Sequence, residues 1–469
     1  MARVFLLNPP TAEPVRTPLL AFAYLASALR RAGHVVGLYD ASAVAADSSD
    51  GEIVRRIKAF SPDLVGLHVK TLYVRDAYRM AALIRAHVAE NVRIVAGGPH
   101  PTVVPGEALR HGCDVEAAGE GEEVLCELAD VADGRRDQAS VGGLTWLDST
   151  GDMQRSPPRG FLPDLDALAS PVDALDLFDP AWYGSAGPVS FGGILSSRGC
   201  PAACTFCCNM VTGRRFRYRS PASVAAEVAC LRDDYGAGAF TFYDDSWAVG
   251  RRRVADLADA LQAVGSVPWN CTAHPSHLDA DVLADMKRAG CLGIDIGMES
   301  GDPERLRKIG KGVTVERVLD VCRFSQDAGM HLVINLMFGW PGETARELER
   351  TLAFLDAAAG FGAMFNARGV LVPYPGTDMY DLHHGEYGFS EWWLRDPPLA
   401  YLPFPSAWNE AEIRRAYASD IALDRNFFRH DDLHLQRIQH ALDRKSEVTW
   451  RRVLGPQVPV GGVPAAGAR

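Results

Sequence analysis

Residues 196–209 read SSRGCPAACTFCCN and contain four of the ten cysteines in this chain of 469 residues. Cys200, Cys204 and Cys207 follow the spacing C-x₃-C-x₂-C, and Cys208 comes directly after them. Three thiolates so close in sequence force one loop to wrap a metal group and leave a coordination position open. An open position distinguishes a catalytic metal site from a closed structural one, so the loop predicts a catalytic iron–sulfur cluster.

A zinc site is the alternative interpretation of these cysteines. Zinc would need a fourth Cys or His ligand nearby, but Cys208 is adjacent to Cys207, and no histidine lies within 60 residues on either side of the loop. Cys200, Cys204 and Cys208 also form C-x₃-C-x₃-C, so Cys208 remains an alternative third ligand. The spacing, with aromatic Phe206 just before Cys207, favours the first assignment.

On the N-terminal side of the loop, residues 1 to about 130 alternate short apolar strands with helical stretches. The expected strands are 4–7, 34–40, 64–69 and 92–96, and the expected helices are 18–32 and 75–88. This order predicts a doubly wound, Rossmann-like parallel sheet, whose ligands bind beyond the carboxyl ends of the strands. Residues 131–190 hold a strand-like piece from Val141 to Trp146 and then many prolines, which indicates a hairpin and an irregular linker.

From residue 191 the alternation returns with longer units. The expected strands are 191–198, 238–245, 268–273, 292–298, 331–338 and 365–372, and the expected helices are 221–234, 251–264, 279–289, 314–328 and 345–359. About six such units fit a partial or full (β/α) barrel, whose site lies at the carboxyl ends of the strands. Residues 385–450 are helical in pattern, and the Pro/Gly-rich tail is expected to be disordered.

The fold class is therefore α/β, with four expected segments. These are a Rossmann domain (1–135), a hairpin and linker (136–190), a partial (β/α) barrel (191–384), and a helical C-terminal region with a disordered tail (385–469).

Composition and charge limit the kind of partner. The net charge of −11 argues against nucleic acid, because phosphate binding needs clustered Lys and Arg. The one basic cluster, at residues 214–219, is interpreted as a solvated loop, with an anion contact near a cofactor as the alternative. No apolar run reaches 18 residues, and the N-terminal apolar run is too short for a signal peptide. We therefore expect a cytoplasmic protein with no membrane partner.

Several further motifs follow the cysteine loop in a fixed order. They are FYDD (242–245), GCLGIDIGMESG (290–301), KG (311–312), FGWPGET (338–344) and YPGT (374–377). Together with the cysteine loop, this order resembles the radical S-adenosylmethionine (SAM) superfamily, in the branch that carries an N-terminal cobalamin-binding-type domain. The resemblance implies a [4Fe–4S] cluster on Cys200, Cys204 and Cys207. It also implies SAM contacts from four residues, namely Phe206, Asp245, Glu299 and Asn335.

Two glycine-rich motifs in the first domain extend the resemblance. GGPHPT (97–102) and GEGE (119–122) are similar to cobalamin-binding domains, and glycines permit close backbone approach to a large ligand. The implied contacts to cobalamin, a candidate third cofactor, are Gly97, Gly98, His100 and Gly119. The domain contains no Asp-x-His-x-x-Gly cobalt-ligand motif. His68 and His100 are the alternative contacts, and a structural role is favoured for each.

The resemblance implies that the reduced cluster cleaves SAM to a 5′-deoxyadenosyl radical, which abstracts hydrogen from a small-molecule substrate, expected to be a natural product. A flavodoxin or ferredoxin is the expected electron donor. Two reactions stay open: cobalamin-dependent methylation, which is slightly favoured, and cobalamin-independent deoxygenation of a sugar diol such as an aminoglycoside. The second would need a partner reductase. A non-catalytic cobalamin or metal sensor is the third hypothesis.

Overall fold

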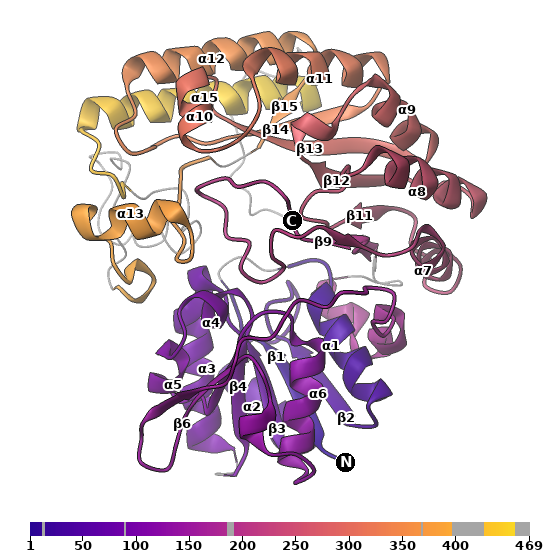
Figure 1. Ribbon diagram of the computed structural model, residues 1–469, viewed down its shortest axis with the longest axis vertical. Helices are drawn as coiled ribbons and strands as arrows, with labels where there is room; N and C mark the ends of the chain where they lie inside the picture. The colour runs from indigo at the N-terminus through magenta and orange to yellow at the C-terminus, as the bar shows by residue number, and fades with distance from the viewer. Residues whose placement is uncertain (12–14, 89–90, 185–191, 367–368, 396–425, 455–469) are drawn as a thin grey trace.

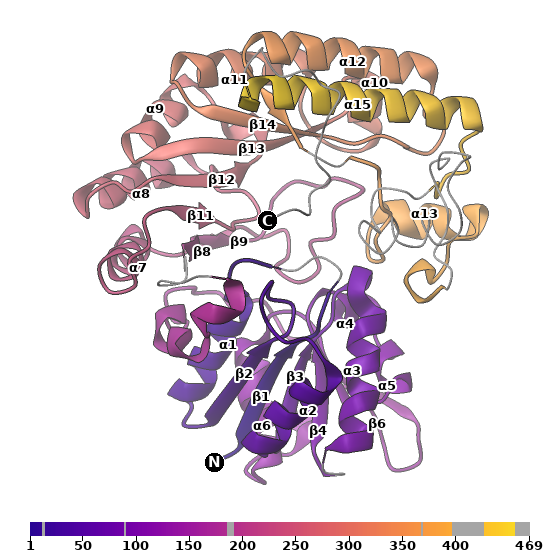
Figure 2. The same cartoon turned by 180° about the vertical axis from the view of Figure 1, so that it is seen from behind.

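The computed structural model describes residues 1–11, 15–88, 91–184, 192–366, 369–395 and 426–454. It contains two α/β units, one above the other in Figure 1, with the N-terminal unit below. The loop between strands β9 and β10 lies between them in both views (Figures 1 and 2). The expected α/β class with two sheets is confirmed.

The N-terminal unit is a seven-stranded sheet with the order β2-β1-β3-β4-β5-β6-β7. Its first five strands are parallel and short, as a sheet covered by helices on both faces requires. Helix α1 packs against α6, and α2 packs against α3 (Figure 1). The elements are β1 (Arg3–Asn8), α1 (Leu20–Arg31), β2 (Val35–Asp40), α2 (Asp50–Phe60), β3 (Leu64–His68), α3 (Val74–His87), β4 (Arg93–Gly97), α4 (Pro99–Val103), α5 (Glu107–Arg110), β5 (Val115–Ala117) and α6 (Gly121–Ala132).

The expected hairpin is formed by β6 (Leu144–Leu147) and β7 (Met153–Arg155). Strand β6 pairs antiparallel with β5, so the hairpin extends the N-terminal sheet rather than standing alone. This pairing favours a first domain that runs to about residue 155, and we propose that limit in place of residue 135.

The second unit is a six-stranded, fully parallel sheet with the order β15-β14-β13-β12-β11-β8. Helices cover its outer side (Figures 1 and 2), which is the arrangement of a partial (β/α) barrel. The strands are β8 (Gly193–Ile194), β11 (Phe240–Phe242), β12 (Trp269–Ala273), β13 (Cys291–Glu299), β14 (His331–Leu336) and β15 (Met364–Phe365). The helices are α7 (Pro221–Asp233), α8 (Arg251–Ala263), α9 (Ala280–Arg288), α10 (Pro303–Lys308), α11 (Val315–Asp327) and α12 (Ala345–Gly360).

Two expected strands differ from the structure. The segment 191–198 is not one strand, because β8 joins the barrel sheet whereas β9 (Ser197–Arg198) pairs with β10 (Arg217–Tyr218). The strand expected at 365–372 is much shorter and ends at Phe365. Where the chain leaves the sheet to form a loop, its residues no longer pair with the neighbouring strand. The alternation of apolar and polar residues does not show where this happens.

The C-terminal region is helical where the structure describes it. Helix α13 (Asp378–Tyr387) crosses the expected boundary at residue 384, and α15 (Asp432–Leu454) packs on α12 and β15. The expected tail lies outside the described residues. None of the helices in the described part of the chain combines the length and hydropathy that a bilayer crossing needs.

A buried ion-pair network joins the two units. Arg198, the last residue of β9, pairs with Glu120 at 3.0 Å and also with Glu122, both at the start of α6. Arg217 of β10 pairs with the second oxygen of Glu120 at 2.9 Å. All four side chains are almost fully buried, so the expectation of a solvated loop at 214–219 is wrong for Arg217, as it is for the buried Arg219.

Replacing Arg198 by methionine should destabilise the protein, because the carboxylate of Glu122 would remain buried without its cation. Removing one partner of a buried pair costs about 3 kcal/mol or more, and urea unfolding followed by circular dichroism measures the loss. The control is Arg252→Met, since the side chain of Arg252 is 95% exposed and lies 3.8 Å from Asp256. Equal unfolding midpoints for both variants would contradict this role of Arg198.

Candidate active site

The cysteine loop is attached to the carboxyl end of the barrel sheet. Its first amide, that of Gly199, donates a hydrogen bond to Asp245 Oδ2 at 2.8 Å, and the hydroxyl of Thr212 donates to the same oxygen at 2.9 Å. The amide of Thr205 donates to the carbonyl of Ile309 at 3.0 Å. The loop is therefore held on both sides of the cysteines by Asp245, which follows β11, and in its middle by Ile309, which follows α10.

The two neighbouring acids after β11 have different roles. Asp244 is buried and accepts hydrogen bonds from the backbone amide of Ser196 and from the hydroxyls of Ser196 and Ser197. Asp245 instead holds the cysteine loop through its contacts with Gly199 and Thr212. The structure thus gives Asp245 a loop-holding contact, and its expected contact with SAM stays a prediction.

Three of the four loop cysteines lie close enough for their charges to interact. Partial desolvation raises the pKa of Cys204 and of Cys207, and charge on Cys200 adds to both shifts. Cys208 faces the loop at residue 376 instead, where a Cβ would lie 3.4 Å from its sulfur. The arrangement therefore favours Cys200, Cys204 and Cys207 as the ligand set.

The thiols do not form a site for a single ion. Within the described ranges, no three Cys, His, Asp or Glu side chains are arranged to hold one metal ion. A cube of iron and sulfur has different requirements, because each thiolate binds a different iron and the sulfurs need not converge on one point. Three mutually close thiols on one loop fit that donor set.

A buried ion pair lies beside the cysteine loop. Lys311 Nζ donates to Glu299 Oε1 at 2.8 Å, and both side chains are less than 10% exposed. Glu299 ends β13 with a φ of +70°, a strained backbone for a non-glycine residue, at the point where the register with β14 shifts. Gly297 makes the pair possible, because a Cβ there would lie 2.0 Å from Glu299 Oε1.

Lys311 of this pair also interacts with the cysteine loop. Burial raises the pKa of Cys204, and the Lys311 ammonium opposes that shift, which favours the thiolate that iron needs. Lys311 Nζ also lies 5.8 Å from the ring centre of Phe206, whose ring packs edge-on against Trp340. The sequence analysis included the Lys311-Gly312 motif but assigned no role to Lys311. Its position shortly after Glu299 was the sequence feature that could have indicated one.

The barrel's inner side is polar. Asn270 and Thr272 of β12 and Asp295 of β13 are exposed, and they alternate with buried residues that face the helices. Asn335 of β14 lies next to Gly297 in the register, so the structure brings it to the same edge as the Glu299–Lys311 pair. Asn335 and Glu299 are thus placed where SAM contacts are expected.

A cavity of about 540 Å³ lies at the carboxyl edge of the N-terminal sheet and is lined from both units. Gly97, Gly98 and Gly119 line it, and a Cβ at residue 97 or 119 would meet no atom within 4 Å. From the barrel side it is lined by four residues close to the cysteines in sequence, namely Leu195, Arg198, Val211 and Thr212, and by Tyr243, which follows β11. The cavity's bare glycines and mostly apolar wall fit a large organic cofactor.

His100 is not at this cavity. It is fully buried, and its ring nitrogens lie 3.1 Å from Thr71 Oγ1 and 2.9 Å from Glu107 Oε1. The indole nitrogen of Trp393 also donates to Glu107, so His100 belongs to a packed network. This gives His100 the structural role that the sequence favoured, and a contact with cobalamin would require the network to open.

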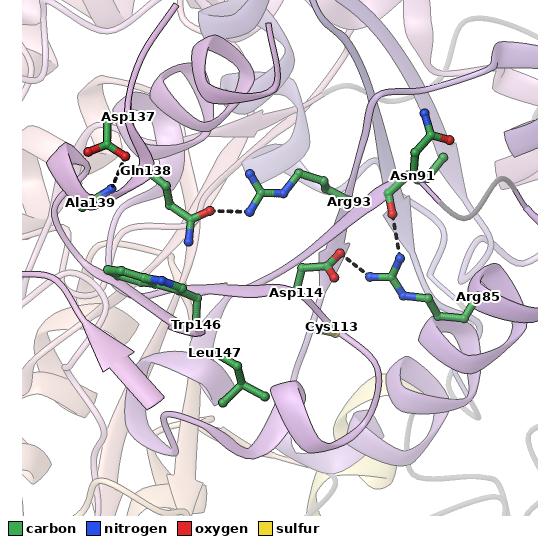
Figure 3. A pocket seen from close by; sticks show the side chains of 11 residues that line it. Arg85, Asn91, Arg93, Cys113, Asp114, Asp137, Gln138, Ala139, Trp146 and Leu147 are labelled. Carbon is green, nitrogen blue, oxygen red and sulfur yellow. Dashed lines mark hydrogen bonds and ion pairs between the residues drawn. The ribbon is translucent and has the colours of Figure 1, made fainter. Parts of the chain in front are cut away.

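A second cavity, of about 530 Å³, lies at the opposite edge of the N-terminal sheet (Figure 3). Its two arginines already have partners: Arg85 pairs with Asp114, and Arg93 donates a hydrogen bond to Gln138. It contains none of the predicted site residues and is remote from the cysteine loop in sequence and in topology.

Comparison with known proteins agrees with this geometry. The model of the radical SAM superfamily matches residues 194–355, and that of the B12 binding domain matches residues 14–129. An uncharacterized methyltransferase from Pyrococcus horikoshii is 30% identical over 432 residues, which cover 89% of this chain and 92% of that protein.

One further relative and one solved structure extend the comparison. The cytidylyl-2-hydroxyethylphosphonate methyltransferase of Streptomyces wedmorensis is 26% identical over 431 residues, covering 79% of this chain and 80% of that protein. The radical SAM methyltransferase TsrM from Kitasatospora setae, solved with cobalamin and a [4Fe–4S] cluster, has the same fold. Its TM-score is 0.70 at 20% identity, with 95% of this chain and 89% of that chain covered. The chain therefore belongs to the radical SAM superfamily, in the branch with an N-terminal B12-binding domain.

Proposed function

We propose that the protein is a cobalamin-dependent radical SAM methyltransferase that acts on a small-molecule substrate. The observation that carries this proposal is the cavity shared by the two units. Its floor is made by the glycines of the B12-binding domain, and its opposite wall is made by residues flanking the cluster cysteines. A corrinoid held there would lie next to the cysteine loop, where it could accept a methyl group that originates from SAM and deliver it to a substrate.

The chain's own residues have separate tasks in this proposal. Cys200, Cys204 and Cys207 would hold the cluster, and Lys311 would favour the thiolate form of Cys204. Glu299 would accept a hydrogen bond from the SAM ammonium or ribose, since it lies at the carboxyl end of a barrel strand. When bound, the cluster supplies the electron that cleaves SAM, and cobalamin supplies a methyl carrier.

The alternative of diol deoxygenation has less support. Two of the relatives compared above are methyltransferases by name, and the cavity suits a corrinoid that a deoxygenase would not need. A partner reductase is required only by the deoxygenation reaction, whereas a flavodoxin or ferredoxin would serve either reaction. The polar inner side of the barrel, with Asn270, Thr272 and Asp295, favours a substrate that forms hydrogen bonds, such as a natural product.

The cluster assignment predicts different behaviour for adjacent cysteines. Cys204→Ala and Cys207→Ala should lose cluster loading after anaerobic reconstitution, because each removes one of three thiolates. Cys208→Ala is the matched control and should retain it. Iron and sulfide content, with the electron paramagnetic resonance (EPR) signal of the reduced cluster, measures loading. Loss of loading in Cys208→Ala with retention in Cys207→Ala would reverse the assignment.

The SAM assignment predicts that Glu299→Gln weakens SAM binding while the cluster remains. A hydrogen bond to a charged group contributes about 1.5–3 kcal/mol, so the dissociation constant should rise at least about tenfold. Equilibrium dialysis with the reconstituted protein measures it. Glu316→Gln, on the exposed face of α11, is the control and should bind SAM as the wild type does. Unchanged affinity in Glu299→Gln would remove this residue from the SAM site.

The proposed reaction predicts a specific set of products. Protein produced with added cobalamin should retain the corrinoid through anaerobic purification. In a reducing assay with candidate substrates, methylation should release S-adenosylhomocysteine together with 5′-deoxyadenosine, as detected by mass spectrometry. Deoxygenation would instead give only 5′-deoxyadenosine and methionine, without bound corrinoid. A sensor without catalytic activity would cleave no SAM.

A further inference from the structure

His68 is the last residue of β3 and lines the cavity shared by the two units. The carboxyl end of a central strand is where ligands of a doubly wound sheet bind. Within its own domain, His68 is the histidine that reaches this cavity, since His100 is enclosed by Thr71 and Glu107. The tautomer of His68 decides which of its ring nitrogens could bind a ligand in this cavity.

A chain of buried hydrogen bonds fixes the tautomer of His68. Asp40 accepts hydrogen bonds from Asn8 Nδ2 at 2.8 Å and from the hydroxyl of Tyr183 at 2.9 Å. Because the amide nitrogen of Asn8 is used by Asp40, its carbonyl oxygen Oδ1 faces His68 Nδ1, at 3.1 Å. That oxygen can only accept, so Nδ1 carries the ring proton and Nε2 presents its lone pair.

The Nε2 atom is left available by its neighbours. Within the part of the chain that the structure describes, no hydrogen bond occupies it. The ring lies against Gly98, where φ is +112° and a Cβ would lie 2.9 Å from His68 Cδ2 and 3.3 Å from Nε2. Only glycine at this position leaves room for the ring at the cavity wall.

This arrangement is the one that metal-bound histidines have in proteins. Such a histidine donates its second N–H to a carboxylate, carbonyl or amide oxygen, which fixes the tautomer and the ring orientation. In this chain the Asp40–Asn8–His68 relay provides that support from buried residues on three adjacent strands, β2, β1 and β3.

We propose that His68 Nε2 is an axial nitrogen donor to the cobalt of a corrinoid bound in this cavity. The inference rests on the proposed function, because it requires a corrinoid. It assigns the cobalt contact to a residue at a strand end, in a domain that lacks the Asp-x-His-x-x-Gly motif. The lone pair of Nε2 forms the bond to cobalt, while the ring proton stays on Nδ1, hydrogen-bonded to Asn8.

The test uses the full-length protein loaded with reduced cobinamide, which lacks the nucleotide base of cobalamin. A resolved axial nitrogen splitting in the EPR spectrum of its cobalt(II) must then come from the protein, because the corrin ring supplies only equatorial nitrogens. We expect each cobalt line to split into a nitrogen triplet, which becomes a doublet when the protein is labelled with ¹⁵N-histidine. Bound cobinamide without this coupling overturns the proposal and leaves cobalamin binding intact. Failure to bind any corrinoid overturns the proposed function as well.

A pair of variants locates the coupling on one residue. His68→Gln should retain the corrinoid but lose the nitrogen splitting, whereas His111→Gln, at an exposed position in the same domain, should keep it. Splitting that persists in His68→Gln assigns the ligand elsewhere and contradicts the proposal. If His68→Gln does not fold, the absence of a ¹⁵N-dependent splitting in the wild-type protein still overturns the proposal.

Discussion

The site depends on the buried ion pairs between Glu120 and the two arginines Arg198 and Arg217. Glu120 precedes the helix that begins beside the cavity glycines, and Arg198 is two residues before the first cluster cysteine. A buried charge without its partner costs several kcal/mol, so the two units cannot separate here without a penalty. The ion pairs thus fix the distance between the wall that would hold a corrinoid and the loop that would hold a cluster.

The cysteine loop has a second set of restraints on the barrel side. Asp245 holds it at Gly199 and Thr212, and Lys311 lies near Cys204 while paired with Glu299. The strained backbone at Glu299 belongs to the same region, where strain is typical of functional sites. The cysteine loop and Glu299 are therefore connected through one buried lysine, which couples their positions and their charges.

Much of this architecture follows from sequence patterns. Most strands of both sheets could be predicted because short apolar runs alternate with amphipathic helices, although β5 was not expected and the first and last barrel strands are shorter than expected. The cysteine loop could be placed because its spacing is specific. Other features depend on contacts between residues far apart in the chain. The pairing of β9 with β10, the burial of Arg217 and the Glu299–Lys311 ion pair are of this kind. From the sequence, His68 and His100 are both candidate contacts to cobalamin. Only the folded chain shows that His100 is enclosed and that His68 lines the cavity.

The central claim is that one cavity brings a corrinoid and an iron–sulfur cluster face to face across the two units. The most direct measurement is the magnetic interaction between cobalt(II) of bound cobalamin and the reduced cluster in the same molecule. The account predicts that reducing the cluster broadens the cobalt signal and speeds its relaxation, and that the effect disappears when the cluster is absent. Two full signals that do not influence each other would place the cofactors apart and contradict the account.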